Sequence, residues 1–392
     1  MRHDTDILIS GAGPAGLAAA CALGAEGHRV LLVDPAPPVT DESAQGADLR
    51  TTALLTPARD LLDRAGAWAG IAPHGTPLEV MRIVDATVRT PASRDFAAAD
   101  IGRDTFGWNV SNWLLRRALL DRVAALPGVE TRFGAAVTAL LARSTGARVT
   151  LSDGTRPTAA LVVACDGRDS PLRAMAGIGA RTVDYQQTAI VFAVTHAAPH
   201  GHVSIEVHRA GGPFTLVPLP DRDGAHRSAV VWMDAAEAQD RRMALDDAAF
   251  EAEANARSAD VLGPLTLAGR RAAWPILSRL ADRLTAPRLA LAAEAAHAMP
   301  PIGAQGLNTS LKDVAALRDL TARHGPGTAA MLAAYQRRRW PDMAARMAGI
   351  DLLNRTSIAS AVPVQALRSA GIRVIHDVAP LRRGLMRLGL GA

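Results

Sequence analysis

The 392-residue sequence predicts an α/β protein: a doubly wound, mostly parallel sheet, interrupted by a sheet-rich insertion and followed by a helical C-terminal extension. Three observations predict this fold. The chain opens with a strand–helix–strand pattern, its middle alternates apolar and polar residues, and a buried strand returns late, at 288–293. Apolar residues make up 49% of the chain and charged residues 21%, which is typical of a globular protein.

The first strand–helix–strand unit has the clearest boundaries. Residues 6–10 and 29–33 are short continuous apolar runs, as expected of parallel strands that are covered on both faces. A helix is predicted from about Pro14 to Glu26, with Gly27 placed to end it. Asp34 closes the second strand.

The remaining chain divides into helical and strand-rich stretches. Helices are expected at about 51–65, 111–126, 240–258 and within 294–323, and strands within 77–97, 146–166 (with a turn at Asp153-Gly154) and 187–235. The last ~50 residues are expected to be helical, with breaks at Pro363, Gly371 and Pro380. We therefore assign residues 1–76, 98–180 and 282–340 to a discontinuous nucleotide-binding domain, 77–97 and 181–281 to a second domain, and 341–392 to the extension.

Charge is concentrated at the C-terminal end of the chain. The net charge is +5, but residues 337–392 hold ten arginines and three aspartates, so this tail carries +7 and the remainder −2. Nucleic-acid binding is not expected, because the arginines are not interleaved with aromatics and no known module is present. Arginines separated by Leu, Ile, Val and Met favour a contact with a membrane surface or a partner protein, and a solvated helical tail is the alternative.

Other classes of protein are disfavoured by what the sequence contains. No apolar run approaches the ~18 residues of a membrane span, and the N-terminus does not resemble a secretory signal, so we expect a cytoplasmic protein, peripheral at most at the inner membrane face. Cys21 and Cys165 lack the spacing of a zinc site and are expected in the core. No metal site is predicted.

The loop from Gly11 to Gly16 predicts dinucleotide binding. Gly11 permits a tight turn, Gly13 lets the backbone approach a pyrophosphate, and Gly16 lets helix and strand pack closely. The phosphates would lie at the helix N-terminus, beside Pro14 and Ala15, where free N–H groups favour negative charge. Asp34, 23 residues after Gly11, is placed to bind ribose hydroxyls. This pattern does not distinguish FAD from NAD.

Two later segments have the form of ligand loops. In the first, a strand ends in Asp166-Gly167, which taken alone is more typical of a turn. In the second, the strand at 288–293 runs into Glu294 and then into a loop of two prolines and two glycines. That loop could offer backbone N–H groups to an anionic ring while Glu294 holds sugar hydroxyls.

Together the three segments resemble, in order, the glycine loop, the Asp-Gly motif and the Gly-Asp motif of the class A flavoprotein aromatic hydroxylases, whose fold is that of para-hydroxybenzoate hydroxylase. Within that class the chain resembles the UbiH/UbiF/VisC group of ubiquinone-biosynthesis hydroxylases. Further matching segments cover essentially the whole chain: Asp48–Leu54, Asp184–Ala189, Gly212–Pro220, Trp274–Ile276, Tyr335 and Pro380–Arg383.

The resemblance implies an FAD-dependent monooxygenase that hydroxylates the aromatic ring of a polyprenyl phenol with NADH or NADPH and O2, through a C4a-hydroperoxyflavin. By motif, it implies that FAD is bound by the following residues: Gly11, Gly13, Pro14, Ala15, Gly16, Asp34, Arg50, Arg116, Asp166, Gly167, Glu294, Pro301, Gly303, Ala304, Gln305, Gly306, Leu307 and Asn308. Pro300, Gly303 and Gln305 would line the isoalloxazine. The inserted second domain would hold the substrate.

One motif departs from the family pattern, and one role is left open. The usual Gly-Asp is Ala293-Glu294, which keeps a carboxylate but loses the freedom of a glycine, so we expect a shifted strand end that still binds flavin. A base that deprotonates the phenol is not assigned, and Tyr185, His208 and His226 remain conjectures. His297 is expected to be packed or hydrogen-bonded rather than catalytic.

Two other functions stay open at this point. One is a hydroxylase of the same fold that acts on another small aromatic substrate. The other is a flavoprotein that is not an oxygenase and serves as a partner in a hydroxylase complex, with the basic tail as its interaction face. The sequence does not determine the oligomeric state.

Overall fold

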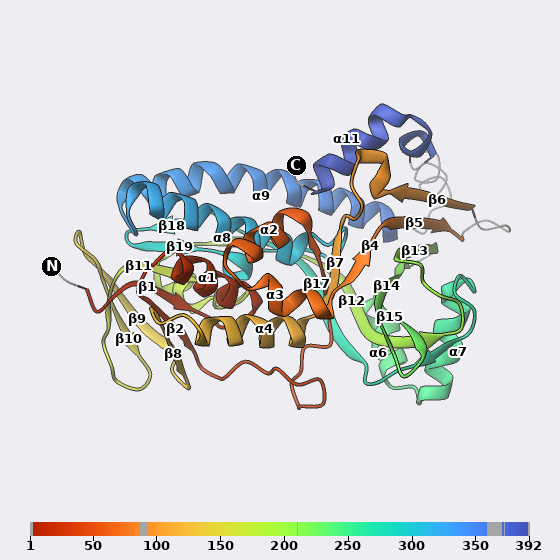
Figure 1. Ribbon diagram of the computed structural model, residues 1–392, viewed down its shortest axis with the longest axis horizontal. Coiled ribbons are helices and arrows are strands. Elements are labelled where there is room, and N and C mark those ends of the chain that lie inside the picture. Colours follow the sequence, from red (N-terminus) through yellow and green to blue (C-terminus); the bar gives the residue numbers. More distant parts are fainter. Residues whose placement is uncertain (1–2, 87–91, 210, 359–370, 372, 391–392) are drawn as a thin grey trace.

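The computed structural model describes residues 3–86, 92–209, 211–358, 371 and 373–390. It contains two large sheets and a small one, with helices α8 and α9 running along the first large sheet toward the second (Figure 1). The mixed α/β architecture confirms the predicted fold class.

An eight-stranded sheet forms the first half of the fold. Its main order is β18-β19-β11-β1-β2-β8, with β10 and β9 attached beside β11. The strands are β1 (Thr5–Ser10), β2 (Val30–Asp34), β8 (Val129–Phe133), β9 (Val137–Ala142), β10 (Ala147–Leu151), β11 (Thr158–Ala164), β18 (Thr285–Ala286) and β19 (Leu289–Leu291). Strands β1, β2, β8, β11 and β19 pair in parallel. Their carboxyl ends therefore meet at one edge, where doubly wound folds bind ligands.

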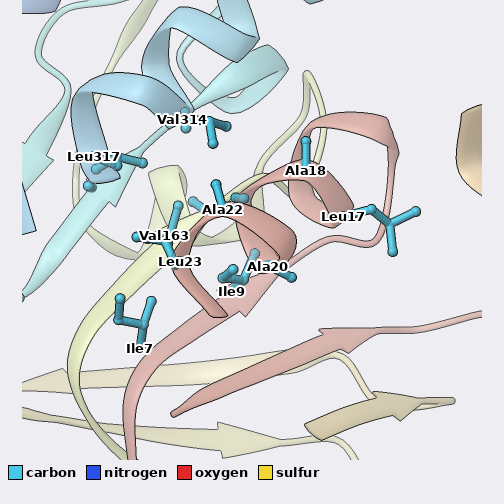
Figure 2. Close-up of a cluster of buried hydrophobic side chains, with 14 of the residues drawn as sticks. Ile7, Ile9, Leu17, Ala18, Ala20, Ala22, Leu23, Val163, Val314 and Leu317 are labelled. Atoms are coloured by element: carbon cyan, nitrogen blue, oxygen red, sulfur yellow. The ribbon is translucent and has the colours of Figure 1, made fainter. Parts of the chain in front are cut away.

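Helix α1 (Pro14–Ala25) packs into the centre of this half. Its middle is built of small apolar residues that are buried on all sides, which lets it contact α4 (Asn112–Ala124) and α8 (Gln305–His324) closely. Figure 2 shows Ala22 and Leu23 of α1 among side chains of β1, β11 and α8. Cys21 is buried in this core as predicted, whereas Cys165 is only half-buried against it.

A nine-stranded sheet forms the second half, with main order β20-β17-β12-β15-β14-β13-β5-β6 and β16 beside β12. The strands are β5 (Val80–Asp85), β6 (Ala92–Ala97), β12 (Ala180–His196), β13 (Val203–Arg209), β14 (Gly212–Arg222), β15 (Ala225–Ala235), β16 (Leu265–Leu267), β17 (Ala272–Ala281) and β20 (His297–Ala298). A core centred on Phe192, Phe214, Trp232 and Phe250 lies between one face of this sheet and α7 (Asp247–Ser258).

The expected helix at 51–65 is wrong in its first third. Residues Thr51–Leu55 form strand β3, which pairs with β7 (Gly107–Ser111) in a three-stranded sheet with β4 (Thr76–Leu78). Helix α2 (Thr56–Arg64) starts only there, with Pro57 in its first turn. The β-branched Thr51 and Thr52 favour the extended backbone that this pairing stabilises.

The expected helix at 240–258 is two helices. Helix α6 (Ala236–Met243) ends before Ala244, and the Asp246 side chain caps α7 by accepting the Ala249 N–H at 2.8 Å. The remaining short helices are α3 (Trp68–Ile71), α5 (Pro171–Met175), η1 (Ala72–His74), η2 (Ala98–Ile101) and η3 (Ala293–Ala295).

The C-terminal region is helical, as predicted. Helix α9 (Ala329–Ile358) continues through Pro341, and α11 (Ala379–Leu390) begins with Pro380 in its first turn. Gly371 is itself helical rather than a break, and Pro363 lies outside the described residues. None of the helices in the described part of the chain is long and apolar enough to cross a membrane.

A buried ion pair joins both long helices to the segment after β19. Asp313 of α8 is fully buried, and its Oδ1 accepts a hydrogen bond from Arg339 Nε of α9 at 2.7 Å. Its Oδ2 lies 2.8 Å from His297 Nε2 and accepts the Ala293 N–H at 3.0 Å. Arg339 also donates to the Thr309 carbonyl. His297 therefore has a packing role, as expected.

Ala293, which stands where the family motif has glycine, adopts the left-handed conformation. Its φ is +55°, whereas Ala292 before it is extended, with a φ of −138°. A side-chain Cβ is strained in the left-handed region. The hydrogen bond to buried Asp313 holds the peptide in this geometry, so the turn is retained at a local cost in stability.

Replacing Asp313 by alanine is expected to lower the free energy of unfolding by about 3–5 kcal/mol, because three buried groups would lose their acceptor: Arg339 Nε, His297 and the Ala293 N–H. Arg339 would keep only its ion pair with the partly exposed Asp342. Asp319→Ala on the same helix is the control. Asp319 pairs with Arg318 and Arg338 at the surface, so its loss should cost about 1 kcal/mol or less. Urea unfolding measures both, and equal losses would contradict a central role for the buried pair.

Replacing Ala293 by glycine is expected to raise the free energy of unfolding by about 1 kcal/mol, because the left-handed strain is relieved. The matched control is Ala292→Gly, which should lower it by about 0.5–1 kcal/mol, since that residue is extended. Urea unfolding measures both variants. A loss of stability in both would show that Ala293 is not strained.

Candidate active site

The glycine loop turns tightly at the carboxyl end of β1. Gly11 has a φ of +108°, and a Cβ there would collide with the Cys165 carbonyl at the end of β11. A Cβ on Gly16 would collide with the Gly11 carbonyl. A Cβ on Gly13 would meet no protein atom within 4 Å, and no side chain caps the N-terminus of α1. The loop thus presents uncapped backbone to an open side, as a bound pyrophosphate requires.

Asp34 is held against this loop. Its Oδ2 accepts the Ala12 N–H at 2.6 Å, and its Oδ1 accepts the Ala36 N–H at 2.9 Å. These bonds orient the carboxylate at the carboxyl end of β2, where the motif places the ribose hydroxyls of a dinucleotide.

Asp166 lies beside the glycine loop, since its backbone N would be 3.0 Å from a Cβ on Gly11. Its Oδ2 accepts the Leu172 N–H at 3.1 Å, while its Oδ1 is buried with no hydrogen-bond partner among the described residues. Burial raises the pKa of this carboxyl. An unsatisfied buried oxygen is costly, and a ligand hydroxyl or N–H could satisfy it. Gly167 follows in the left-handed region, with a φ of +86°.

Arg50 is positioned by a buried acid that the sequence analysis did not single out. Asp48 accepts two hydrogen bonds from the Arg50 guanidinium, each 2.8 Å, and one from the Arg50 backbone N–H at 3.1 Å. It also accepts one from Asn112 at 3.0 Å, and Arg116 lies 3.4 Å away. Burial opposes ionisation of Asp48, but these donors and charges hold its pKa below the ordinary value. The Arg50 guanidinium stacks 4.1 Å from the ring centroid of Trp274.

Glu294 belongs to the same charged edge. It lies in η3, is about half-exposed, and faces Arg168 at 3.6 Å. Its charge also raises the pKa of Arg50, against the effect of burial and in addition to Asp48. The carboxylate therefore remains near two arginines and accessible to a ligand, despite the extra methylene relative to Asp.

The segment from Pro300 to Asn308 is a loop up to Ala304 and then the start of α8. Asn308 donates to the Ala53 and Ala304 carbonyls at 2.7 and 2.6 Å and accepts the Leu55 N–H at 2.9 Å, which ties the loop to β3. Ala304 is left-handed and caps α8 without a side-chain bond. The loop and first turn contain Pro301, Gly303, Gln305, Gly306 and Leu307. An uncapped helix N-terminus here would favour an electron-rich ring.

An apolar wall faces this loop from the nine-stranded sheet. Ile302 packs against a cluster formed by Ala189, Met233 and Ile276, with Tyr185 and Val231 at its margin. The Tyr185 hydroxyl donates to Asp351 at 2.6 Å and lies 2.8 Å from Ser278 Oγ. Burial, together with Asp351, raises the pKa of Tyr185 to about 12, which disfavours it as a base near neutral pH.

The other two conjectured bases are occupied as well. His208 Nε2 lies 2.7 Å from Glu206, and His226 Nδ1 lies 2.9 Å from Asp221. Within the described residues, no group of three or more His, Cys, Asp or Glu side chains is arranged to hold a metal ion.

The structure thus brings the predicted site residues to one edge of the parallel sheet, from six separate segments of the chain. Sequence reasoning missed Asp48, Asn112, Arg168 and Trp274, which hold or face the predicted residues. Asp48 could have been found, because it lies two residues before Arg50 within a segment that matches the family pattern. Nothing in the sequence links Trp274 to Arg50.

Comparison with known proteins identifies the family. Residues 4–348 match a family model described as an FAD binding domain. The chain is 36% identical over 391 residues to ubiquinone hydroxylase UbiL of Rhodospirillum rubrum, covering 98% of this chain and 89% of that protein. It is 28% identical over 397 residues to the 3-demethoxyubiquinol 3-hydroxylase of Escherichia coli, covering 100% and 99%.

A solved structure supports the fold independently. The p-nitrophenol 4-monooxygenase PnpA of Pseudomonas putida superposes with a TM-score of 0.81 at 19% identity, covering 100% of this chain and 99% of that one. The cofactor of this family is FAD, the dinucleotide that the glycine loop is predicted to bind. The chain belongs to the family of FAD-dependent aromatic hydroxylases that includes the ubiquinone hydroxylases.

Proposed function

We propose that this monooxygenase hydroxylates the aromatic ring of a polyprenyl-phenol intermediate of ubiquinone biosynthesis, with NADH or NADPH as reductant and O2 as oxidant. The observation that carries the proposal is the 36% identity to a ubiquinone hydroxylase along nearly the whole chain. The chain covers about nine-tenths of that protein, so the comparison includes the nine-stranded sheet as well as the eight-stranded sheet.

The residues at the sheet edge fit FAD. The pyrophosphate would lie on the uncapped N-terminus of α1 beside Gly13, and Asp34 would accept hydrogen bonds from the ribose. Arg50, held by Asp48 and Trp274, would lie along the cofactor, and Glu294 would face its ribityl or pyrophosphate region. When bound, FAD supplies the oxygen-activating chemistry, and the protein supplies position, dryness and charge.

The apolar wall around Ile302 suits the ring and the prenyl chain of the substrate. Met233 and Ile276 are almost fully buried beside Ile302, so a substrate ring at the margin of this wall would be shielded from water. Exclusion of water protects a reactive oxidant from wasteful breakdown. The polar groups near the wall, Tyr185, Ser278 and Asp351, are hydrogen-bonded to one another. The substrate ring would therefore be held mainly by van der Waals contacts with apolar side chains.

Helix α11 would bring the enzyme to the membrane that holds its substrate. It carries three arginines and no acid, and Leu381, Leu385 and Leu388 are exposed at helical spacing. Apolar residues flanked by arginine favour an anionic bilayer surface. The Gly389 carbonyl accepts a hydrogen bond from Gln305 at 3.1 Å, so this helix ends beside the flavin loop.

Gly13→Ala tests the cofactor site. The added Cβ meets no protein atom, so the apoprotein should unfold at an unchanged temperature, while FAD affinity falls at least ~10-fold because the pyrophosphate loses its close approach. The control is Gly349→Ala in α9, whose Cβ is equally unobstructed and which should bind FAD normally. Fluorescence titration with FAD measures both. If Gly13→Ala bound FAD as tightly as the wild type, the pyrophosphate would not lie on this loop.

Deletion of the gene, followed by mass analysis of quinone precursors, tests the reaction. An accumulated precursor that lacks one hydroxyl group is expected, and its structure names the ring position. Complementation by the wild-type gene should restore the quinone, and complementation by Gly13→Ala should not. An unchanged quinone pool would refute the assignment to ubiquinone biosynthesis.

Vesicle sedimentation tests the membrane contact. Leu385→Glu with Leu388→Glu should abolish sedimentation with vesicles containing phosphatidylglycerol, because two charges would enter the apolar stripe. Leu141→Glu, at an equally exposed apolar site on β9, should leave sedimentation unchanged. Equal behaviour of the two proteins would exclude α11 as the membrane face.

A further inference from the structure

An open surface cavity lies on the face of the nine-stranded sheet that points away from the flavin loop. Successive residues of β15 separate the two faces: Met233 packs with Ile302 of that loop, whereas Trp232 packs with Phe250 of α7. The cavity has a volume of about 220 Å³ and is bordered by Trp232 and by residues of β13, α6 and α7. Helices α6 and α7 lie at the lower right of Figure 1, well apart from α1 and its glycine loop.

Positive charge dominates the lining of this cavity. Arg209, Arg242 and Arg257 contribute three guanidinium groups, against the single carboxylate of Glu253. Burial, with the neighbouring Arg209 and Arg242, lowers the pKa of Arg257 to about 10, although the charge of Asp234 opposes this shift. Crowded like charges of this kind are stabilised when a negative group is placed among them.

The three arginines differ in how firmly they are held. Arg242 is fixed by Asp234 at 2.9 Å and Glu253 at 3.1 Å, and its guanidinium lies 4.3 Å from the ring centroid of Trp232. Arg257 donates to the Gly212 carbonyl. These contacts hold the side chains of Arg242 and Arg257 in place, so the positions of two cavity-lining arginines are set before a ligand binds.

Donors at the cavity remain unsatisfied. The Nε of Arg209 and the Nε1 of Trp232 are buried and have no hydrogen-bond partner within the described part of the chain. Leaving a buried donor unpaired costs about 1–3 kcal/mol, and more where the group is charged. Because both unsatisfied groups are donors, the missing partner must be an acceptor.

We propose that this cavity is a binding site for a small polyanion with phosphate or carboxylate oxygens, separate from the flavin site. The planar, forked donors of arginine match such oxygens, and the indole N–H adds a further donor. The volume equals roughly seven water molecules at ~30 Å³ each, which suffices for a phosphate or a small tricarboxylate but not for a dinucleotide.

The site is tested on the FAD-loaded protein by calorimetric titration with inorganic phosphate, pyrophosphate and citrate, at an ionic strength held constant with chloride. Arg209→Gln should weaken binding of the preferred anion at least ~10-fold, because it removes a charged donor whose Nε has no other partner. Arg209→Lys, which keeps the charge but loses the fork, should fall between this variant and the wild type.

The matched control is Arg241→Gln. Arg241 neighbours Arg242 and pairs with the same Glu253, but it does not line the cavity, so anion binding should stay within about twofold of wild type. The melting temperature in chloride confirms that each variant is folded. The proposal is overturned if none of the three anions binds the wild type, or if Arg209→Gln binds as tightly as the wild type does.

Discussion

The buried pair of Asp313 and Arg339 is the interaction on which the active-site edge depends. It joins α8 to α9 and, through the Ala293 N–H and His297, fixes the turn that follows β19. An unpaired charge at this depth would be strongly destabilising, so the four groups can hardly move separately. The buried network of Asp313, Arg339, His297 and the Ala293 N–H therefore fixes the position of Glu294 and of the loop into α8.

That network explains how the family motif can tolerate alanine for glycine. The left-handed φ at Ala293 costs a modest amount of local stability. The hydrogen bond from Ala293 to Asp313 is part of a buried charged network whose disruption would cost much more free energy. The backbone at Ala293 therefore stays left-handed, and the extra methylene of Glu294 lies on the exposed side, beside Arg168.

The nine-stranded sheet separates two environments by the alternation of its side chains. One face offers Met233 and Ile276 to the flavin loop and suits an apolar aromatic substrate. The opposite face carries the aromatic core around Phe250 and, at its edge, the arginine-lined cavity. Trp232 and Met233 are neighbours in β15 but lie on opposite faces of the sheet. An anion bound beside Trp232 would therefore contact the same strand that presents Met233 to the flavin loop.

The sequence by itself determined the features that depend on local pattern. The βαβ start, the glycine loop with Asp34, and the family all followed from residues close in the chain, because periodicity and turn chemistry act over short range. Only the tertiary structure decided that 51–55 is a strand, since β3 exists through pairing with β7, whose partner residues are 52 to 60 positions away. It also decided which groups hold the site: Asp48 with Arg116, Arg50 with Trp274, and Asp313 with Arg339 and Ala293. These contacts join residues up to about 220 positions apart, and their energies come from burial and charge pairing that no local window contains.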